Sequence, residues 1–447
     1  MVYIHGGNYC SGASNNNYPE SLVLQSRASI VVVTLNYRLN VFGFLGSFEL
    51  KQRSEDKSTG NYGLQDQRLA LAWVRDHIKS FGGNGLDVTI FGESAGGNSV
   101  LNHLTQPASF GLYKKAGVQS GGYVSAVPFH EAQASFLQLL NITGCNDVAC
   151  LVNSSVEQLS DVIRTVDPDT WSGPTIDGVS LSGFPQQLVS RGEYNKNVPV
   201  LLGSNRDEAA LFMEPPDFPP NLTEQRFDLE IEGSFLSKNI TEVKQLFSPS
   251  AYHYPSNLGN FSRWWWELMR VATQGGQNKR KGQPSMGLGH CSVRCMAHAL
   301  LQGGTPQVFT YLFSHPSQEV LRDVNEGTPL FGTGPGNVLV PHATGLAYVF
   351  GMLDSLDKHN GEADLARNIS AYWLQFATSG NPNRAGLPYW PSYAIGNETT
   401  LFLDTGLGAI KPIAKYHAPQ CDFFDGQPHS VCLFNSAHST PASEVIV

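Results

Sequence analysis

The sequence predicts an α/β fold in which helices cover both faces of a mostly parallel, twisted β-sheet. Through residue 122, short apolar strand signals alternate with segments whose apolar residues recur at helical spacing. The strand signals are continuous runs, which is typical of strands buried on both faces. Alternation of strands and helices favours parallel pairing, because parallel strands need a crossover connection between them.

The first two strand signals lie within residues 1–37. Residues 1–5 (MVYIH) form a short apolar run that Gly6 and Gly7 end. Residues 29–37 (SIVVVTLNY) are rich in β-branched side chains. Both runs predict buried strands, and the glycine pair predicts a turn after the first of them.

A helix, a strand, a second helix and another strand follow. Residues 63–83 carry a broad apolar face at helical spacing and end at two glycines, so they predict a helix. Residues 87–93 (DVTIFGE) predict a strand, and residues 95–105 (AGGNSVLNHLT) can continue from it as a helix. Residues 116–122 (AGVQSGG) are again strand-like.

The rest of the chain gives weaker signals. Residues 198–205 and 307–313 predict two more buried strands, and residues 361–380 predict a late amphipathic helix. The irregular segments between them are expected to be cap and loop insertions over one sheet. We therefore expect one domain over residues 1–425, followed by a tail over residues 426–447 that is disordered beyond Cys432.

Composition and charge argue against several classes of partner. The chain has 447 residues and a formal net charge of −9, without a long basic run. Nucleic acids and anionic membrane surfaces are therefore poor partners. No apolar run reaches the ~20 residues that a membrane-spanning helix needs.

Cysteines and glycosylation sequons indicate an oxidising, secretory compartment. Cysteines occur in close pairs, and Asn-x-Ser/Thr sequons are more frequent than this composition gives by chance. The alternative is a cytosolic protein with buried thiols. Because the chain opens with MVYIH and not with a signal peptide, we expect the sequence to be a fragment of a secreted protein. The candidate glycosylation sites are Asn141, Asn153, Asn221, Asn239, Asn260, Asn368 and Asn397.

Residues 92–97 (GESAGG) contain the strongest candidate for a catalytic residue. A G-x-S-x-G pattern is a weak signal by itself in a glycine-rich chain, so its context decides. Ser94 stands where a predicted strand passes into a predicted helix, and Gly92 and Gly96 leave room for a sharp turn. The turn would raise the serine hydroxyl above the sheet, near the positive N-terminal end of the helix. This context predicts a nucleophile at Ser94.

A serine nucleophile needs a base, and the base needs an acid that orients it. In this fold class the acid follows the serine along the chain and precedes the histidine. Asp207 and Glu208 both follow the strand predicted at residues 198–205, and spacing leaves both open. His342 is the candidate base.

Together these motifs resemble the type-B carboxylesterase and cholinesterase family of α/β-hydrolases. They recur in the order of that family over residues 1–425. The matching motifs are HGG at 5–7, NYRLNVFGFL at 36–45, NYGLQDQRLALAWV at 61–74, FGESAGG at 91–97, VQSGG at 118–122, PTIDGVSL at 174–181, GSNRDEAALF at 203–212, HATGLAYVFG at 342–351 and WLQFATSGNPN at 373–383.

The resemblance implies roles for the candidate residues. Ser94 matches the nucleophile of the family, Glu208 matches the acid and His342 matches the base. Asn8 stands where the family usually has a third glycine, and asparagine tolerates a positive φ better than most residues. Three backbone N–H groups match the oxyanion hole, those of Gly7, Asn8 and Ala95.

Two further positions of the family lie beside the triad and hold it through hydrogen bonds. Glu93 and Ser120 match them, and the alternative is that they form a satisfied polar pair in the core. Trp264, Trp265 and Trp266 are expected to form the packing face of a cap helix, with an aromatic wall for substrate as the alternative.

The cysteines divide into expected bridges and an open case. Cys291 and Cys295 lie between His290 and His298 at helical spacing, which leaves a disulfide, buried thiols or a metal site open. Cys10 is left over, close behind the oxyanion turn. Two pairs match short disulfide loops of the family, Cys145–Cys150 and Cys421–Cys432.

Two functions follow from the resemblance. The first is a secreted serine esterase that cleaves small or lipid-like carboxylic esters through an acyl-enzyme, without a metal or other cofactor. The second is an inactive esterase-like fragment, or an adhesion module like the neuroligins. The presence of Ser94, Glu208 and His342 favours the esterase. The resemblance implies that the N-terminal strands of the family are absent from this sequence. The tryptophan that holds choline in cholinesterases lies in that region, so the resemblance does not identify a cholinesterase. The sequence does not indicate an oligomeric state.

Overall fold

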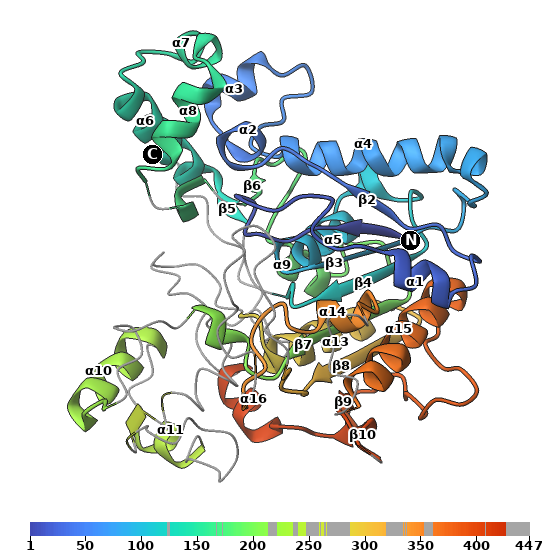
Figure 1. Ribbon diagram of the computed structural model, residues 1–447. Helices are drawn as coiled ribbons and strands as arrows, with labels where there is room; N and C mark the ends of the chain where they lie inside the picture. The colour runs from blue at the N-terminus through green and yellow to red at the C-terminus, as the bar shows by residue number, and fades with distance from the viewer. Residues whose placement is uncertain are drawn as a thin grey trace.

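A twisted β-sheet with helices on both faces is the framework of the structure (Figure 1). The computed structural model describes residues 1–122, 126–166, 168–171, 173–212, 221–235, 240–246, 259, 261–262, 265, 287–318, 334, 336, 338–352, 361–406 and 408–425. Within these residues, the main sheet has eight strands, and every neighbouring pair is parallel except the antiparallel last pair. In spatial order they are β2 (Val33–Leu35), β1 (Val2–Ile4), β3 (Thr89–Glu93), β4 (Lys115–Gln119), β7 (Val200–Asn205), β8 (Val308–Phe313), β9 (Thr399–Leu403) and β10 (Lys411–Ala414).

Both faces of the central strands are buried, as their continuous apolar runs predict. Successive residues of a strand point to opposite faces. Ile4, Ile90 and Leu202 therefore pack in one hydrophobic cluster. Their neighbours in the chain pack in a second cluster on the other face, namely Tyr3, Phe91 and Leu201.

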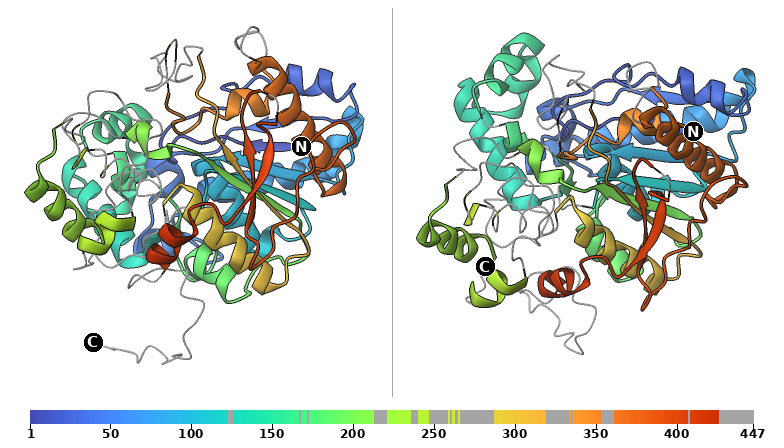
Figure 2. Two further views of the ribbon diagram at one scale, coloured as in Figure 1. Left: turned by 90° about the horizontal axis from the view of Figure 1, so that it is seen from below. Right: turned by 60° about the horizontal axis from the view of Figure 1, so that its bottom comes forward.

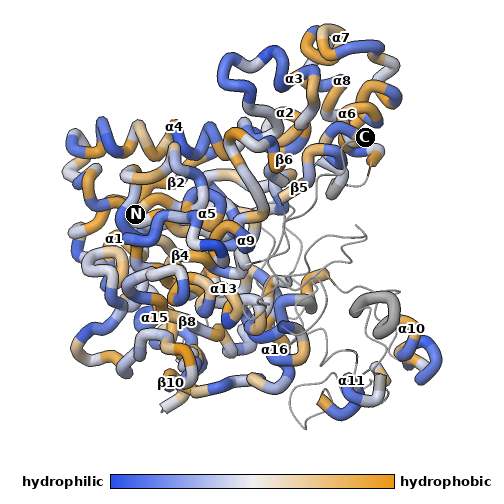
Figure 3. The backbone as a smooth tube through the Cα atoms, turned by 180° about the vertical axis from the view of Figure 1, so that it is seen from behind, coloured by the Kyte–Doolittle hydropathy of each residue, from blue (hydrophilic) through white to orange (hydrophobic). Residues whose placement is uncertain are grey.

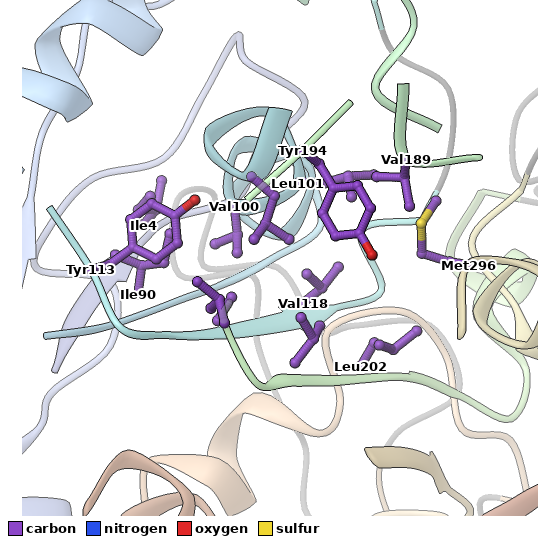
Figure 4. Packing of buried hydrophobic residues seen from close by; sticks show 14 of the residues in the cluster. Ile4, Ile90, Val100, Leu101, Tyr113, Val118, Val189, Tyr194, Leu202 and Met296 are labelled. Carbon is purple, nitrogen blue, oxygen red and sulfur yellow. The ribbon is translucent and has the colours of Figure 1, made fainter. Parts of the chain in front are cut away.

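The helices divide between these two clusters. The first cluster lies between the sheet and α4 (Tyr62–His77), α5 (Ala95–Thr105), α9 (Pro185–Ser190) and α13 (His290–Gly303) (Figure 4). The second lies between the sheet and α14 (Leu346–Val349) and α15 (Glu362–Ser379). The short helix α1 (Glu20–Gln25) packs beside α15. The predicted fold class, an α/β sandwich of helices around a mostly parallel sheet, is confirmed.

Two predicted helices end at the glycines that the sequence indicates. The helix expected over residues 63–83 is α4 with a 3-10 turn at Ile78–Phe81, and Gly82 ends it at a φ of 82°. Hydrophobic and hydrophilic residues alternate along α4 in Figure 3, as its amphipathic pattern requires. The helix expected over residues 361–380 is α15, which Gly380 ends at a φ of 77°. A positive φ costs glycine little, so both helices end at their glycines.

One strand is shorter than its sequence predicts. The β-branched run at residues 29–37 pairs only over β2, Val33–Leu35. Its position at the end of the strand order explains the difference, because β2 has β1 as a neighbour on one side only in the described sheet.

An insertion packs on one side of the sheet and builds a small core of its own. Phe136, Leu139 and Leu151 pack there with Trp171 and with Val41 from α2. In Figures 1 and 2 this group lies on the opposite side of the molecule from α15. The elements of this region are α2 (Asn40–Phe44), α3 (Phe48–Arg53), β5 (Val127–Pro128), α6 (Phe129–Thr143), α7 (Val148–Asn153), α8 (Val156–Ile163) and β6 (Thr175–Ile176).

Two disulfides revise part of the predicted cysteine pairing. Cys145 and Cys150 are bridged as expected, with an S–S distance of 2.00 Å. Cys421 is bridged to Cys291 over a separation of 130 residues, which joins α16 (Ala418–Asp425) to α13. The predicted bridge Cys421–Cys432 is therefore wrong, and of the alternatives left open for Cys291 and Cys295, a bridge between the two is excluded. Cys432 lies outside the described residues.

Helix geometry explains why Cys291 does not pair with Cys295. The two residues are one turn apart on α13, where Cβ atoms are about 5–6 Å apart, whereas a disulfide needs about 3.8 Å. Cys295 is also in a disulfide, which removes both thiolates that a metal site would need. His290 instead donates from Nε2 to the carbonyl of Tyr416 (3.1 Å).

The remaining predicted surface and cap residues are only partly described. Asn368 is half-buried on α15. Trp265 is buried and meets Phe227 of α10 (Glu224–Phe235) edge to face, while Trp264 and Trp266 lie outside the described residues. Asn239 and Asn260 lie outside them as well. The exposed sequons are Asn141, Asn153, Asn221 and Asn397.

Candidate active site

Ser94 occupies a sharp turn between β3 and α5. Its backbone has a φ of 58° and a ψ of −125°, a strained conformation for a residue with a side chain. A Cβ on Gly96 would lie 2.0 Å from the carbonyl oxygen of Ile4, so α5 can approach β1 only through a glycine. A Cβ on Gly92 would lie 2.5 Å from the backbone of Gly96. Both glycines of the motif are thus required by the close packing of the turn.

Hydrogen bonds to neighbouring elements hold this turn in place. The N–H of Ser94 donates to the carbonyl of Gln119 at the end of β4 (2.9 Å), and the carbonyl of Ser94 accepts from Asn98 on α5 (2.8 Å). The side chain is half-buried at the N-terminus of α5. Partial positive charge at that helix end favours negative charge that develops beside the serine.

His342 and Glu208 are in direct contact although they are far apart in the chain. Nδ1 of His342 donates to Oε2 of Glu208 at 2.5 Å, and both side chains are buried. Oε1 of Glu208 accepts from Ser120 Oγ (2.6 Å) and from the N–H of Asn205 (2.6 Å). The carboxylate is therefore held on both oxygens, and one of them orients the imidazole.

The carboxylate of Asp207 bonds to residues other than His342. Its Oδ2 accepts from Nε of Arg206 (3.0 Å) and from the N–H of Val340 (2.9 Å). Of the two acids that spacing left open, Glu208 is the one that contacts His342. Asp207 links the end of β7 to the segment that carries His342.

The second nitrogen of His342 faces another carboxylate. Nε2 lies 3.1 Å from Oε1 of Glu93, without the angles of a hydrogen bond. Burial lowers the pKa of His342, but the charges of Glu93 and Glu208 outweigh it and raise the pKa to about 9. Burial raises the pKa of Glu93 to about 7, although the neighbouring His342 lowers it. Glu93 precedes Ser94 in the chain, so this contact brings His342 to the serine turn. Within the described ranges, Ser94 Oγ makes no hydrogen bond.

The turn after β1 lies against the serine turn. A Cβ on Gly6 would be 3.0 Å from Cβ of Ser94. Gly7 has a φ of 102°, and a Cβ there would lie 2.4 Å from the carbonyl oxygen of Ser11, so this position needs a glycine. Asn8 follows with a φ of 51°, the positive value that its residue type tolerates. The turn that carries Gly7 and Asn8 thus lies against the turn of Ser94, and Ala95 follows the serine as the first residue of α5.

Two further residues at the site have a defined position. The thiol of Cys10 donates to the carbonyl of Gly7 (3.4 Å), so it stabilises the turn after β1. The ring of Phe212 lies 5.2 Å from the ring of His342 and is 43% exposed, so it forms part of the wall on the solvent side. Sequence reasoning missed Phe212, although it closes the GSNRDEAALF motif four residues after Glu208.

Comparison with known proteins places this geometry in a family. The model of the carboxylesterase family matches residues 1–424, and the chain belongs to that family. It is 31% identical over 407 residues to pyrethroid hydrolase Ces2e of Rattus norvegicus, covering 88% of this chain and 65% of the relative. It is 30% identical over 424 residues to the para-nitrobenzyl esterase of Bacillus subtilis, covering 91% and 75%.

Solved structures agree with this assignment. A carboxylesterase of Geobacillus stearothermophilus superposes with a TM-score of 0.74 at 25% identity, covering 95% of this chain and 82% of the other. A PNB esterase superposes with a TM-score of 0.72 at 25% identity, covering 94% and 79%. The chain thus has the α/β-hydrolase fold of these esterases, and it spans about two thirds of the length of the rat relative. Within the described residues, no helix is long and apolar enough to cross a membrane.

Proposed function

We propose that the protein is a serine carboxylic-ester hydrolase that works through an acyl-enzyme. The observation that carries this proposal is the contact of 2.5 Å between His342 and Glu208 beside a serine on a strained strand-to-helix turn. The carboxylate fixes the tautomer in which Nε2 of His342 is free of a proton and can accept one. Membership of the carboxylesterase family supports the same reaction.

Acylation proceeds through the three side chains in turn. Ser94 Oγ attacks the ester carbonyl carbon while its proton passes to Nε2 of His342. The tetrahedral oxyanion is stabilised by backbone N–H groups, and Glu208 stabilises the imidazolium. Collapse breaks the bond to the alcohol oxygen, which takes the proton from His342 and leaves as an alcohol. The oxyanion donors are those of Gly7, Asn8 and Ala95.

Deacylation repeats these steps with water. His342 takes a proton from a water molecule, whose oxygen attacks the acyl carbon. Collapse returns the proton to Ser94 Oγ and releases the carboxylic acid. None of these steps calls for a metal or an organic cofactor, because the chain itself supplies nucleophile, base and oxyanion donors.

Glu93 and Ser94 compete for the same nitrogen of His342. Nε2 contacts Glu93 in the structure, and it must reach Ser94 Oγ for acylation. Catalytic hydrogen bonds are often loose in an unliganded enzyme and tighten with substrate. Glu93 is accordingly a positioning residue, and Ser120 is another because it holds Glu208.

A secreted location is the second part of the proposal. Two disulfides and exposed sequons support an oxidising compartment in which glycans are added. The substrate class is a small or lipid-like carboxylic ester.

Hydrolysis of p-nitrophenyl acetate tests the proposed reaction. We expect turnover by the wild-type chain and a loss of at least about 10³-fold in Ser94→Ala. Ser190→Ala is a matched control, because Ser190 is exposed at the end of α9 and donates to the carbonyl of Gln187 (2.8 Å) within its own helix. Equal activity of Ser94→Ala and wild type would contradict the assignment.

A further inference from the structure

A small cavity lies beside two residues that contact the base and the acid. Its wall includes Glu93 and Ser120 from the site, and Gln119, Gly345 and Trp373 from the strands and helices around it. The space open to the centre of a water molecule is ≈ 10 Å³. That is about the room that one buried water molecule occupies.

Gly345 creates part of this space. It precedes α14 with a φ of −65° and a ψ of −18°, a conformation that any residue can adopt. The glycine is therefore not required by its backbone. A Cβ at this position would lie 3.0 Å from Oδ1 of Asn205 and 3.5 Å from the ring of Phe313. Even one methyl group would thus narrow the cavity.

Three buried polar atoms of the lining residues lack a hydrogen-bond partner among the described residues. They are Nε1 of Trp373, Oε1 of Gln119 and Oε1 of Glu93. The three side chains are 3%, 2% and 5% exposed, so bulk water does not reach them. Unpaired buried polar atoms are costly, and such atoms are usually satisfied by an ordered water.

The chemistry of these atoms fits a single ligand. Trp373 offers one N–H donor, while Gln119 and Glu93 offer two acceptors. A water molecule accepts one hydrogen bond and donates two in the complementary arrangement. We propose that this cavity is a binding site for one structural water molecule, which joins Trp373 to the carboxylate of Glu93 beside the catalytic base.

This water would act on catalysis through Glu93, and that part of the inference rests on the proposed function. A hydrogen bond from the water favours the charged form of Glu93, whose pKa burial raises to about 7. The other groups that face Glu93 are His342 and Glu208, together with the buried phenols of Tyr3 and Tyr311. Because charged Glu93 raises the pKa of His342, the water would set the pH at which the base becomes neutral.

Crystallography tests the site directly. In a crystal structure of the wild-type chain at a resolution that shows ordered waters, we expect one peak within hydrogen-bond distance of all three atoms. In Gly345→Ala we expect the peak to be lost. A dry cavity in the wild type would overturn the proposal.

A pair of tryptophan variants tests the role of the donor. Trp373→Phe removes the N–H but keeps an aromatic ring, whereas Trp390→Phe is the matched control. The ring centres of Trp390 and Trp373 lie 6.0 Å apart, and Trp390 does not line the cavity. Trp390 donates its own N–H to the carbonyl of Thr310 (3.0 Å).

The expected readout is a change of pH dependence. Without the donor, the pKa of Glu93 rises, less of it is charged, and the pKa of His342 falls. The acidic limb of kcat/KM should then move to lower pH by about half a unit in Trp373→Phe, and stay in place in Trp390→Phe. If the acidic limb of kcat/KM lies at the same pH in wild type and in Trp373→Phe, the proposed role of the Trp373 N–H is overturned.

The two proposals fail in different ways. If the chain hydrolyses no ester, the proposed function fails, but the electron density still decides whether the water is present. NMR titration of His342 then replaces kcat/KM as the readout, because it needs no turnover. We expect the same direction of shift in Trp373→Phe.

Discussion

Replacement of Glu208 by glutamine separates the catalytic carboxylate from its neighbour Asp207. The change keeps the size of the side chain and removes the charge that contacts His342 at 2.5 Å. During acylation the imidazole becomes positive, so the variant loses the attraction between two opposite charges. At ~4 Å between charge centres and an effective dielectric constant of about 20, that attraction is about 4 kcal/mol. This corresponds to a loss of about 10³-fold in kcat/KM.

Asp207→Asn is the matched control, because it removes a neighbouring buried charge. Asp207 forms an ion pair with Arg206 at 2.9 Å, in which both side chains are buried. Breaking such a pair costs stability, on the order of 3 kcal/mol, because it leaves an uncompensated charge. We expect a lower midpoint of urea unfolding with kcat/KM per folded molecule within about tenfold of wild type. The assay is p-nitrophenyl acetate hydrolysis normalised to folded protein. A Glu208→Gln variant within tenfold of wild type, or an equal loss in Asp207→Asn, would refute the assignment of the acid.

Three further predictions follow from the same structure. Since the base must be neutral, and its pKa is raised to about 9 by Glu93 and Glu208 against burial, kcat/KM of the wild type should rise with pH up to about 9. Glu93→Gln should move this limb to lower pH, and an unmoved limb would show that Glu93 does not act on His342. Loss of the bridge between Cys291 and Cys421 in a Cys291→Ser, Cys421→Ser variant should lower the free energy of unfolding by about 5 kcal/mol, because the bridge closes a loop of 130 residues. Loss of the bridge between Cys145 and Cys150, which closes a loop of 5 residues, should lower it by about 2 kcal/mol. Urea unfolding measures both, and the reverse order would contradict the loop argument. Secretion from a eukaryotic host should give glycans on exposed Asn141, Asn153, Asn221 and Asn397, and a protein whose mobility is unchanged by endoglycosidase would contradict a secreted location.

The framework of the fold could be predicted because its signals are local. Continuous apolar runs gave the buried strands, and glycines after periodic segments gave the ends of α4 and α15. The strained turn at Ser94 was also predictable, because strand, small residues and helix follow each other directly. The length of β2 was not predictable from the run at residues 29–37, since pairing depends on which strands lie beside it.

Features that depend on distant parts of the chain could not be predicted. Spacing could not separate Asp207 from Glu208, because adjacent residues differ only in the direction in which their side chains point. The structure separates them through contacts with residues more than 130 positions away, His342 for Glu208 and Val340 for Asp207. The bridge between Cys291 and Cys421 required α16 to return to α13, which no short pattern records. The cavity at Gly345 likewise exists only where several elements meet.

Labelling with a fluorophosphonate probe tests the central claim most directly. The probe phosphonylates a serine only where nucleophile, base and oxyanion donors act together. Intact-mass spectrometry should show a single adduct on the wild-type chain and none on Ser94→Ala, with Ser190→Ala labelled as wild type. A folded wild-type chain without an adduct, or an adduct that persists in Ser94→Ala, would contradict the claim that Ser94 is the nucleophile of an esterase.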